Sequence, residues 1–271
     1  MARGDVNAAV WRAGTHVSEY DSRALEPAEV LLLARYREKF SGRVLDVGCG
    51  AGRILGYLLS LGADAVAVDI APAMVERCRQ RFPGADVRVA DLETLPNSVD
   101  GPFDVVLMSD NVLDVLDDSR RRAVLGELAG LLAPGGLVVF SSHNLAHWER
   151  TAPPESGQVA PTRLRGVGAR LGHLANRSPV WMLNAVVRLP RRRSNRRRLG
   201  PLQHRAAHHA IINDEAHDYS LLHYYISRTD QELQLDQLGY ALVDALALDG
   251  DSVAPGAEGR GPSLYYVATA R

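Results

Sequence analysis

One stretch decides the fold of this 271-residue chain: Val44-Leu45-Asp46-Val47-Gly48-Cys49-Gly50-Ala51-Gly52-Arg53, followed directly by Ile54-Leu55-Gly56-Tyr57-Leu58-Leu59. Branched apolar residues around a single acid predict a buried strand, and the glycines predict a tight loop. The apolar residues after the loop have helical spacing. A strand, a glycine turn and a helix in this order are typical of the start of a nucleotide-binding βαβ unit.

The acid in this strand indicates which ligand the loop accepts. A pyrophosphate is bound by bare backbone N–H groups at a helix N-terminus, and an adjacent carboxylate would repel it. Asp46 stands two residues before the first glycine, where it suits a cationic ligand. S-adenosylmethionine carries an ammonium and a sulfonium but no phosphate, so the stretch predicts a methyl-donor pocket.

The following sequence predicts four more strands of the same sheet. Each is an apolar run, helical segments separate them, and Pro134-Gly135-Gly136 ends the helix before the last one. Strands that alternate with helices predict an α/β fold with a doubly wound, mostly parallel sheet, which binds its ligand at the carboxyl ends of the strands. The four runs are residues 65–69, 86–92, 103–108 and 136–140.

The chain resembles the class I S-adenosylmethionine-dependent methyltransferases of the small-molecule type. The resemblance rests on the glycine loop, the acid that ends the second strand, the pair Asp91-Leu92 and the turn Leu132-Ala133-Pro134-Gly135-Gly136-Leu137. It covers about residues 25–145 and resumes at 228–270. It implies a Rossmann-like sheet of seven strands and S-adenosylmethionine as the cofactor.

We expect three regions along the chain. Residues 1–145 would form an N-terminal helix and the donor-binding core, and residues 228–271 would complete the core sheet. Between them, residues 146–227 would form an Arg-rich insertion of helix and loop after strand five. We expect this insertion to contain a short helix at 181–187 and to cover the substrate side of the sheet.

The resemblance also implies roles for residues on the donor side. Asp46 would face the methionine amino group, Asp69 the ribose hydroxyls and Asp91 the adenine amine. Each acid alone is equally compatible with a cap or turn, but their joint occurrence behind this loop favours ligand binding. Arg53 reaches the ligand carboxylate or lies exposed, and Asn111 lines the methyl-transfer channel or forms a turn. The other donor-side candidates are Gly48, Cys49 and Gly50 in the loop, and Ile70 and Leu92, which would sandwich the adenine.

Three residues are candidates for the catalytic base on the acceptor side. His143 follows strand five and either takes a proton from the acceptor or is hydrogen-bonded within a loop. His223 and Tyr224 belong to a polar-aromatic cluster at 217–225, which either lines the acceptor pocket or packs the insertion onto the core. His143 and His147 have the spacing of a metal pair, but no third ligand is evident, so no metal is predicted.

Charge is unevenly distributed along a chain of 31 basic and 32 acidic residues. Residues 163–205 contain twelve arginines and no acid, which could bind RNA phosphates or an anionic membrane. Yet the chain has one lysine against 30 arginines, no recognised RNA module is present, and charge runs are usually solvated. We therefore expect nucleic acid to be an improbable partner. Two cysteines without metal or redox spacing, and no segment of transmembrane length, favour a cytoplasmic location.

Three classes of function fit these observations. The first is a methyltransferase of a small molecule, with secondary metabolism as one setting. The second is an RNA or protein methyltransferase that docks its substrate through the insertion, and the third is a donor-binding protein without catalysis. The segment Ser109-Asp110-Asn111-Val112 lacks the Asn/Asp-Pro-Pro-Tyr/Phe pattern of enzymes that methylate exocyclic amines. The sequence leaves the accepting atom, nitrogen, oxygen or carbon, and the oligomeric state undetermined.

Overall fold

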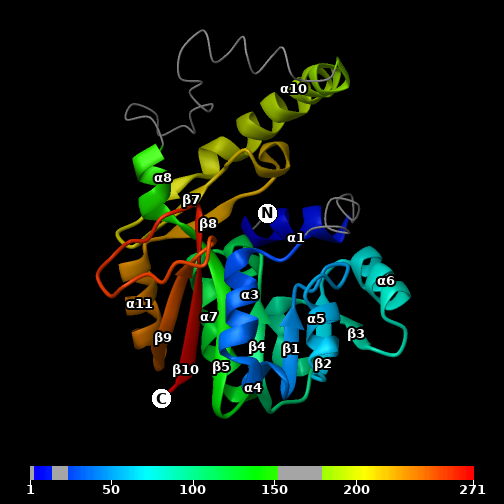
Figure 1. Cartoon of the computed structure of the whole chain (residues 1–271). Coiled ribbons are helices and arrows are strands. Elements are labelled where there is room, and N and C mark those ends of the chain that lie inside the picture. Colours follow the sequence, from blue (N-terminus) through cyan, green and yellow to red (C-terminus); the bar gives the residue numbers. More distant parts are fainter. Residues whose placement is uncertain (1–2, 14–23, 152–178) are drawn as a thin grey trace.

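The computed structural model describes residues 3–13, 24–151 and 179–271, which form one ten-stranded sheet with helices on both faces (Figure 1). Seven strands run in the order β3-β2-β1-β4-β5-β10-β9, all parallel except β10, which is antiparallel to both of its neighbours. This confirms the predicted α/β fold and its seven core strands. Their bounds are β1 (Arg43–Val47), β2 (Asp64–Asp69), β3 (Asp86–Val89), β4 (Phe103–Met108), β5 (Leu132–Asn144), β9 (Tyr240–Ala247) and β10 (Ser263–Ala270).

The sheet has ten strands rather than seven because the insertion contributes three of its own. β6 (His204–Arg205), β7 (His209–Ile212) and β8 (His223–Ile226) form an antiparallel unit. β8 pairs in parallel with the last two residues of β5, beyond the part that pairs with β4, and His143 pairs with β10 as well. All four residues of β8 are buried, since both of its faces are covered. The expectation of an insertion made only of helix and loop was therefore wrong.

Two hydrophobic layers hold the helices against the core strands. Successive residues of a strand face opposite sides of the sheet, and accordingly Val44 and Leu45 lie in different clusters. The first layer packs under α3 (Pro27–Arg35), α4 (Arg37–Phe40), α5 (Leu55–Ser60) and α6 (Pro72–Arg81). The second packs under α7 (Asp118–Leu128) and α11 (Arg228–Gln237), together with the short helices η1 (Leu92–Asn97), η2 (Val112–Val115) and η3 (Ala129–Leu131).

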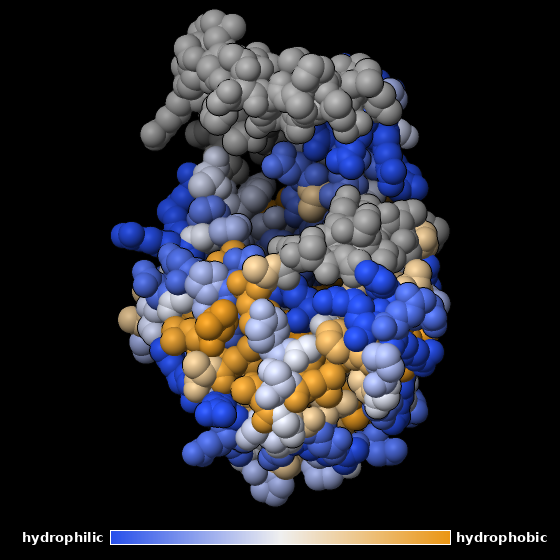
Figure 2. Space-filling view, turned by 45° about the vertical axis from the view of Figure 1, so that its right-hand side comes forward, coloured by the Kyte–Doolittle hydropathy of each residue, from blue (hydrophilic) through white to orange (hydrophobic). Residues whose placement is uncertain are grey.

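The helices of the insertion lie beyond the carboxyl ends of the strands (Figure 1). They are α8 (Leu145–Thr151) and α10 (Pro179–Leu199). The short helix η4 (Gly200–Leu202) connects α10 to β6, and η5 (Ala216–Tyr219) lies between β7 and β8. α10 is longer than the helix expected at 181–187 and contains seven of the twelve arginines of residues 163–205. In Figure 2 the upper part of the molecule, outside the grey residues, is hydrophilic, and hydrophobic surface gathers over the core. The first part of the insertion after α8, residues 152–178, lies outside the described residues.

The N-terminal helix α1 (Arg3–Arg12) crosses the same end of the sheet. The buried Asn7 fastens it: Nδ2 donates to the carbonyls of Val115 and Leu222, both at 2.7 Å, and Oδ1 accepts from Leu222 N at 3.0 Å. These bonds connect α1 to η2 of the core and to the segment before β8. Among the described helices, none combines the length and apolar character that crossing a membrane requires.

Candidate active site

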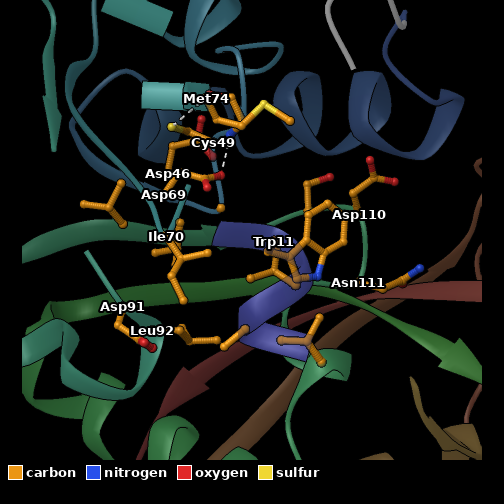
Figure 3. A pocket seen from close by; sticks show the side chains of 18 of the residues that line it. Trp11, Asp46, Cys49, Asp69, Ile70, Met74, Asp91, Leu92, Asp110 and Asn111 are labelled. Carbon is orange, nitrogen blue, oxygen red and sulfur yellow. Dashed lines mark hydrogen bonds between the residues drawn. The ribbon is translucent and has the colours of Figure 1, made fainter. Parts of the chain in front are cut away.

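A cavity opens where the carboxyl ends of β1, β2, β4 and β5 meet α1 and η5 (Figure 3). The glycine loop after β1 forms one wall. Gly48 has a φ of +72°, and a Cβ there would lie 2.4 Å from Val112, so the loop closes directly onto η2. Gly50, with a φ of +55°, meets nothing within 4 Å. The loop backbone is therefore open to a ligand at Gly50, and Cys49 beside it is buried.

The carboxyl group of Asp46 lies in an unusual environment. It is buried, and among the described residues no group hydrogen-bonds to its Oδ2. Burial raises the pKa of Asp46 to about 7; Arg53 opposes this, and the negative charges of Asp69 and Glu29 add to it. A buried carboxyl without a partner is costly unless a cation or donor reaches it. The site therefore fits a ligand that brings positive charge, as S-adenosylmethionine does.

Asp69 ends β2 and holds the glycine loop in place. Its Oδ2 accepts from Gly50 N at 2.9 Å and its Oδ1 from Ala71 N at 2.8 Å. Burial raises the pKa of Asp69, while these backbone donors oppose the shift. Asp69 and the following Ile70 both line the cavity, close to the loop as Figure 3 shows.

Asp91 and Leu92 line the next part of the cavity, after β3. Asp91 caps η1 through Glu93 N at 3.1 Å, and its Oδ2 lies 2.7 Å from Arg12 of α1. Trp11, also on α1, lines the cavity opposite the glycine loop and makes an edge contact with His217 of η5. The N-terminal helix is thus a wall of the donor cavity.

Arg53 lines the cavity, but its charge is paired. Its guanidinium binds both carboxylate oxygens of Glu29 on α3, with Nη2 to Oε1 at 2.8 Å. Glu29 also accepts hydrogen bonds from Ser109 and Tyr265. Burial alone would raise the pKa of Glu29, but Arg53 and these donors lower it. Arg53 therefore connects α3 to the loop, and its contact with a ligand carboxylate stays a prediction.

Asn111 adopts the left-handed conformation, with a φ of 60°, at the start of η2. Its backbone N donates to Ser141 Oγ at 2.8 Å, and its Nδ2 lies 3.1 Å from Ser263 Oγ and 3.4 Å from His143 Nε2. It lines the cavity as well as forming the turn. Both expected roles are thus compatible with its position.

His143 is held by a buried carboxylate that the sequence did not single out. Its Nδ1 and its backbone N both lie 2.6 Å from Oδ2 of Asp114 on η2. The fully buried Arg121 binds the other oxygen of Asp114 at 2.6 Å. Burial alone would raise the pKa of Asp114, but Arg121 and His143 lower it. Because an ionised carboxylate only accepts, the Nδ1 of His143 carries a proton and its Nε2 is left to act as a base.

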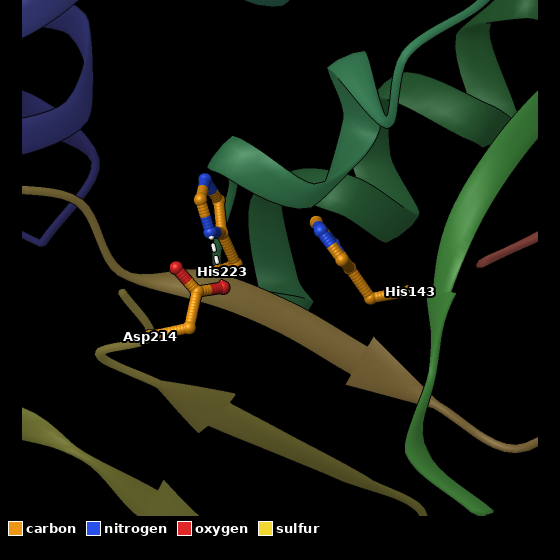
Figure 4. A group of neighbouring side chains, drawn as sticks. All are labelled: His143, Asp214 and His223. Atoms are coloured by element: carbon orange, nitrogen blue, oxygen red, sulfur yellow. Dashed lines mark hydrogen bonds and ion pairs between the residues drawn. The ribbon is translucent and has the colours of Figure 1, made fainter. Parts of the chain in front are cut away.

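His223 forms a second pair of the same kind (Figure 4). Its Nδ1 lies 2.7 Å from Oδ2 of Asp214, which also accepts from the Tyr225 hydroxyl at 2.9 Å. The rings of His143 and His223 stack with centroids 5.0 Å apart at 28°, and both line the cavity. Burial alone would lower the pKa of His223, but Asp214, and then Asp114, raise it.

His143, His223 and Asp214 offer nitrogen and oxygen atoms within 4.8 Å of one another, a set that could hold a metal ion. Zinc ligands must converge on one point about 2.0–2.1 Å from each nitrogen. Stacked rings direct their in-plane lone pairs side by side, and both Nδ1 atoms already bind carboxylates. The arrangement suits proton transfer better than metal binding. His147, which has the spacing of a metal pair with His143, is not part of this group.

Tyr224 is placed differently from the other two candidate bases. Its hydroxyl donates to Asp118 at 2.7 Å and accepts from Gln234 at 3.2 Å, and its ring lies under Arg121. It is not among the residues that line the cavity. Adjacent strand residues face opposite sides, so β8 can direct His223 or Tyr224 into the cavity but not both. Tyr224 is therefore not retained as a base.

Other residues of the site went unrecognised in the sequence. Asp114 and Asp214 are ordinary acids in loop-like segments, and Trp11 stands in a helix with no motif around it. The packing of η2 against β5 places Asp114, the pairing of β5 with β8 places Asp214, and the passage of α1 across the sheet places Trp11. No local pattern would have identified them.

Comparison with known proteins agrees with this architecture. Residues 44–136 match the family model described as a methyltransferase domain. The chain is 34% identical over 125 residues to a ubiquinone biosynthesis O-methyltransferase of Xanthomonas euvesicatoria pv. vesicatoria, covering 45% of this chain and 51% of that protein. It is 30% identical over 137 residues to the malonyl-[acyl-carrier protein] O-methyltransferase of Salmonella typhimurium, covering 51% and 53%. The chain thus spans about half the length of the curated relatives it matches.

Solved structures share the fold over nearly the whole chain. A DhpI–SAH complex has a TM-score of 0.58 at 16% identity, covering 99% of this chain and 97% of that one. The 1,6-didemethyltoxoflavin-N1-methyltransferase of Burkholderia thailandensis has a TM-score of 0.57 at 17% identity, covering 100% and 91%. The fold and the donor cavity define a Rossmann-like methyltransferase domain. The family match shows a methyltransferase domain at residues 44–136, and the solved structures show that the chain shares the fold of S-adenosylmethionine-dependent methyltransferases.

Proposed function

We propose that this protein transfers the methyl group of S-adenosylmethionine to a hydroxyl oxygen of a small-molecule acceptor. The observation that carries the proposal is the His143–Asp114 pair, which lines the same cavity as the donor-side residues. A hydroxyl oxygen must lose its proton as the new bond to carbon forms, whereas an amine can lose its proton afterwards. An oriented imidazole in the cavity therefore suits oxygen as the acceptor.

The residues divide the work between two sides of one cavity. Asp46, Asp69 and the loop at Gly50 would hold the donor, with Asp91, Leu92 and Trp11 around its adenine side. When bound, S-adenosylmethionine supplies the methyl group, so the protein contributes mainly position and orientation. Asp114 fixes the His143 ring, and Nε2 of His143 takes the proton of the acceptor hydroxyl.

The names of the relatives support this choice. Both curated relatives are O-methyltransferases. The setting in biosynthesis, secondary metabolism included, is part of the proposal, as is a cytoplasmic location, which the free, buried Cys49 and Cys78 suit.

The test is methyl transfer by the purified protein to matched panels of hydroxyl compounds, amines, peptides and RNA. We expect S-adenosylhomocysteine to form with hydroxyl compounds. His143→Gln should lower turnover by about 10²- to 10⁴-fold and leave the affinity for S-adenosylhomocysteine unchanged, and His147→Gln should change neither. Transfer only to amines, or full turnover by His143→Gln, would refute the proposal.

A further inference from the structure

His223 and Asp214 form a second imidazole–carboxylate pair that the proposed reaction does not need. One base is enough for one proton, and His143 supplies it. Yet His223 lines the same cavity and lies with its ring stacked on that of His143. A buried ion pair of this kind is costly to form, so its presence calls for a role.

The charges around the two rings decide which of them holds a proton. Among the described residues, the ionisable groups bonded to the two rings or to their carboxylates are Asp114, Asp214, Arg121 and the neutral hydroxyl of Tyr225. Two carboxylates against one guanidinium leave one negative charge, which one additional proton neutralises. A second proton would place two imidazolium rings face to face at 5.0 Å.

The extra proton belongs to His223 rather than to His143. Asp114 already has a full positive partner in Arg121, whereas among the described residues Asp214 is bonded to one imidazole, that of His223. Asp214 has its pKa lowered, because His223, His143 and Tyr225 outweigh the effect of burial. His223 is then the cation of the pair, and Nε2 of His143 is the atom that receives the proton of the acceptor.

We infer that the imidazolium of His223 binds an anionic oxygen of the acceptor, next to the hydroxyl that His143 deprotonates. The acceptor class is then a hydroxy compound with a carboxylate or a similar anionic oxygen on a neighbouring atom. This inference rests on the proposed function for the identity of the methylated group. It assigns His223 to substrate recognition and leaves proton removal to His143.

Such an acceptor also completes the charge balance of the reaction. Its anion pairs with His223, and its negative charge offsets the repulsion between the two rings once His143 has taken the proton of the hydroxyl. As methyl transfer proceeds, the donor's S–CH₃ bond breaks with its electron pair left on sulfur, the O–CH₃ bond forms, and the hydroxyl proton passes to Nε2 of His143. The donor loses its sulfonium charge in the same step, and His143 gains one positive charge.

Binding to the protein saturated with S-adenosylhomocysteine tests the inference without turnover. The probes are 2-hydroxybenzoate, its neutral analogue 2-hydroxybenzamide, and 4-hydroxybenzoate, in which the two groups are far apart. We expect calorimetry to show 2-hydroxybenzoate binding about 10-fold or more tightly than either of the others. His223→Gln should abolish this preference and retain the affinity for S-adenosylhomocysteine. His209→Gln, a partly buried histidine that does not line the cavity, is the matched control and should keep the preference.

A second measurement keeps the inference falsifiable if a variant misfolds. Nitrogen NMR of the wild-type protein with labelled histidine should show His223 protonated on both nitrogens at pH 7. The inference would be overturned if His223 were neutral at pH 7. It would also be overturned if 2-hydroxybenzoate bound no more tightly than the other probes, or if none of the probes bound. Methylation of hydroxyl compounds without an anion preference would leave the proposed function standing. An anion preference together with methyl transfer only to amines would support the role of His223 and refute the proposed function.

Discussion

The rings of His143 and His223 stack with their centroids 5.0 Å apart, although the two residues are eighty positions apart in the sequence. The contact exists because β8, a strand of the insertion, pairs with the last two residues of β5. Each ring is fixed from behind by its own carboxylate, Asp114 or Asp214. The core supplies one half of the acceptor site and the insertion supplies the other.

Arg121 should be the residue on which the stability of this arrangement depends most. It is fully buried and binds Asp114 at 2.6 Å and Gln231 at 2.7 Å. Arg121→Met leaves the carboxylate of Asp114 buried without its charge partner, which should lower the free energy of unfolding by about 3–5 kcal/mol. Denaturant titration measures this. Arg122→Met is the control, because Arg122 makes an exposed bond to Gln237, and it should cost less than about 1 kcal/mol.

Asp46 should make both stability and donor binding depend on pH. Its pKa of about 7 in the folded protein lies above the usual value of 3.8, so the folded state holds a proton that the unfolded state has lost. The stability of the donor-free protein should therefore fall as pH rises towards 7, by on the order of 2 kcal/mol between pH 5.5 and 7. Asp46→Asn should remove this contribution.

The same carboxyl should act in the opposite direction on ligand affinity. A cationic ligand favours ionised Asp46, so S-adenosylhomocysteine, which keeps the ammonium, should bind more tightly as pH rises through 7. Calorimetry across this pH range should show that Asp46→Asn binds S-adenosylhomocysteine weakly, with an affinity that does not change with pH. A wild-type affinity that weakens with rising pH would contradict the assignment of Asp46 to the amino group.

The sequence predicted the donor side better than the acceptor side, for a physical reason. Donor-side residues stand in a contiguous loop or at the ends of neighbouring core strands, so a short pattern and strand order suffice to place them. The acceptor side depends on partners such as Asp114, 29 positions before His143, and on which face of β8 turns inward. Because successive side chains of a strand point to opposite faces, the sequence predicts that His223 and Tyr224 face opposite sides of β8. Which of the two enters the cavity depends on how β8 packs in the tertiary structure.

Asn7 should control how firmly α1 closes over the donor. Its three hydrogen bonds, of 2.7, 2.7 and 3.0 Å, are buried and hold α1 to η2 and to Leu222. Asn7→Ala should release the helix that carries Trp11, and the affinity for S-adenosylhomocysteine should fall about 10-fold or more. Arg12→Ala removes only a half-exposed ion pair with Asp91 and should change affinity much less. Equal effects of the two variants would show that Asn7 does not anchor the helix.

Four arginines of α10 fall into two sets with different expected effects. Arg192 binds Asp218 at 2.9 Å, and Asp218 belongs to η5, which also contributes Ala216 and His217 to the donor cavity. Arg192→Ser should loosen η5 and weaken donor binding. Arg193, Arg197 and Arg198 instead line a shallow groove on the surface of α10.

Replacing these three arginines by serine tests the small-molecule proposal against its macromolecular alternative. If the acceptor is small, the triple variant should keep wild-type donor affinity and nearly full turnover on hydroxyl compounds. If the chain docks RNA, the wild-type protein should bind a generic RNA with an affinity that falls steeply as salt rises, and the triple variant should have a shallower salt dependence. Titrations of the two proteins at several salt concentrations distinguish the cases. A steep dependence that is lost with the three arginines, together with methylation of the RNA, would replace the small acceptor by a nucleic acid.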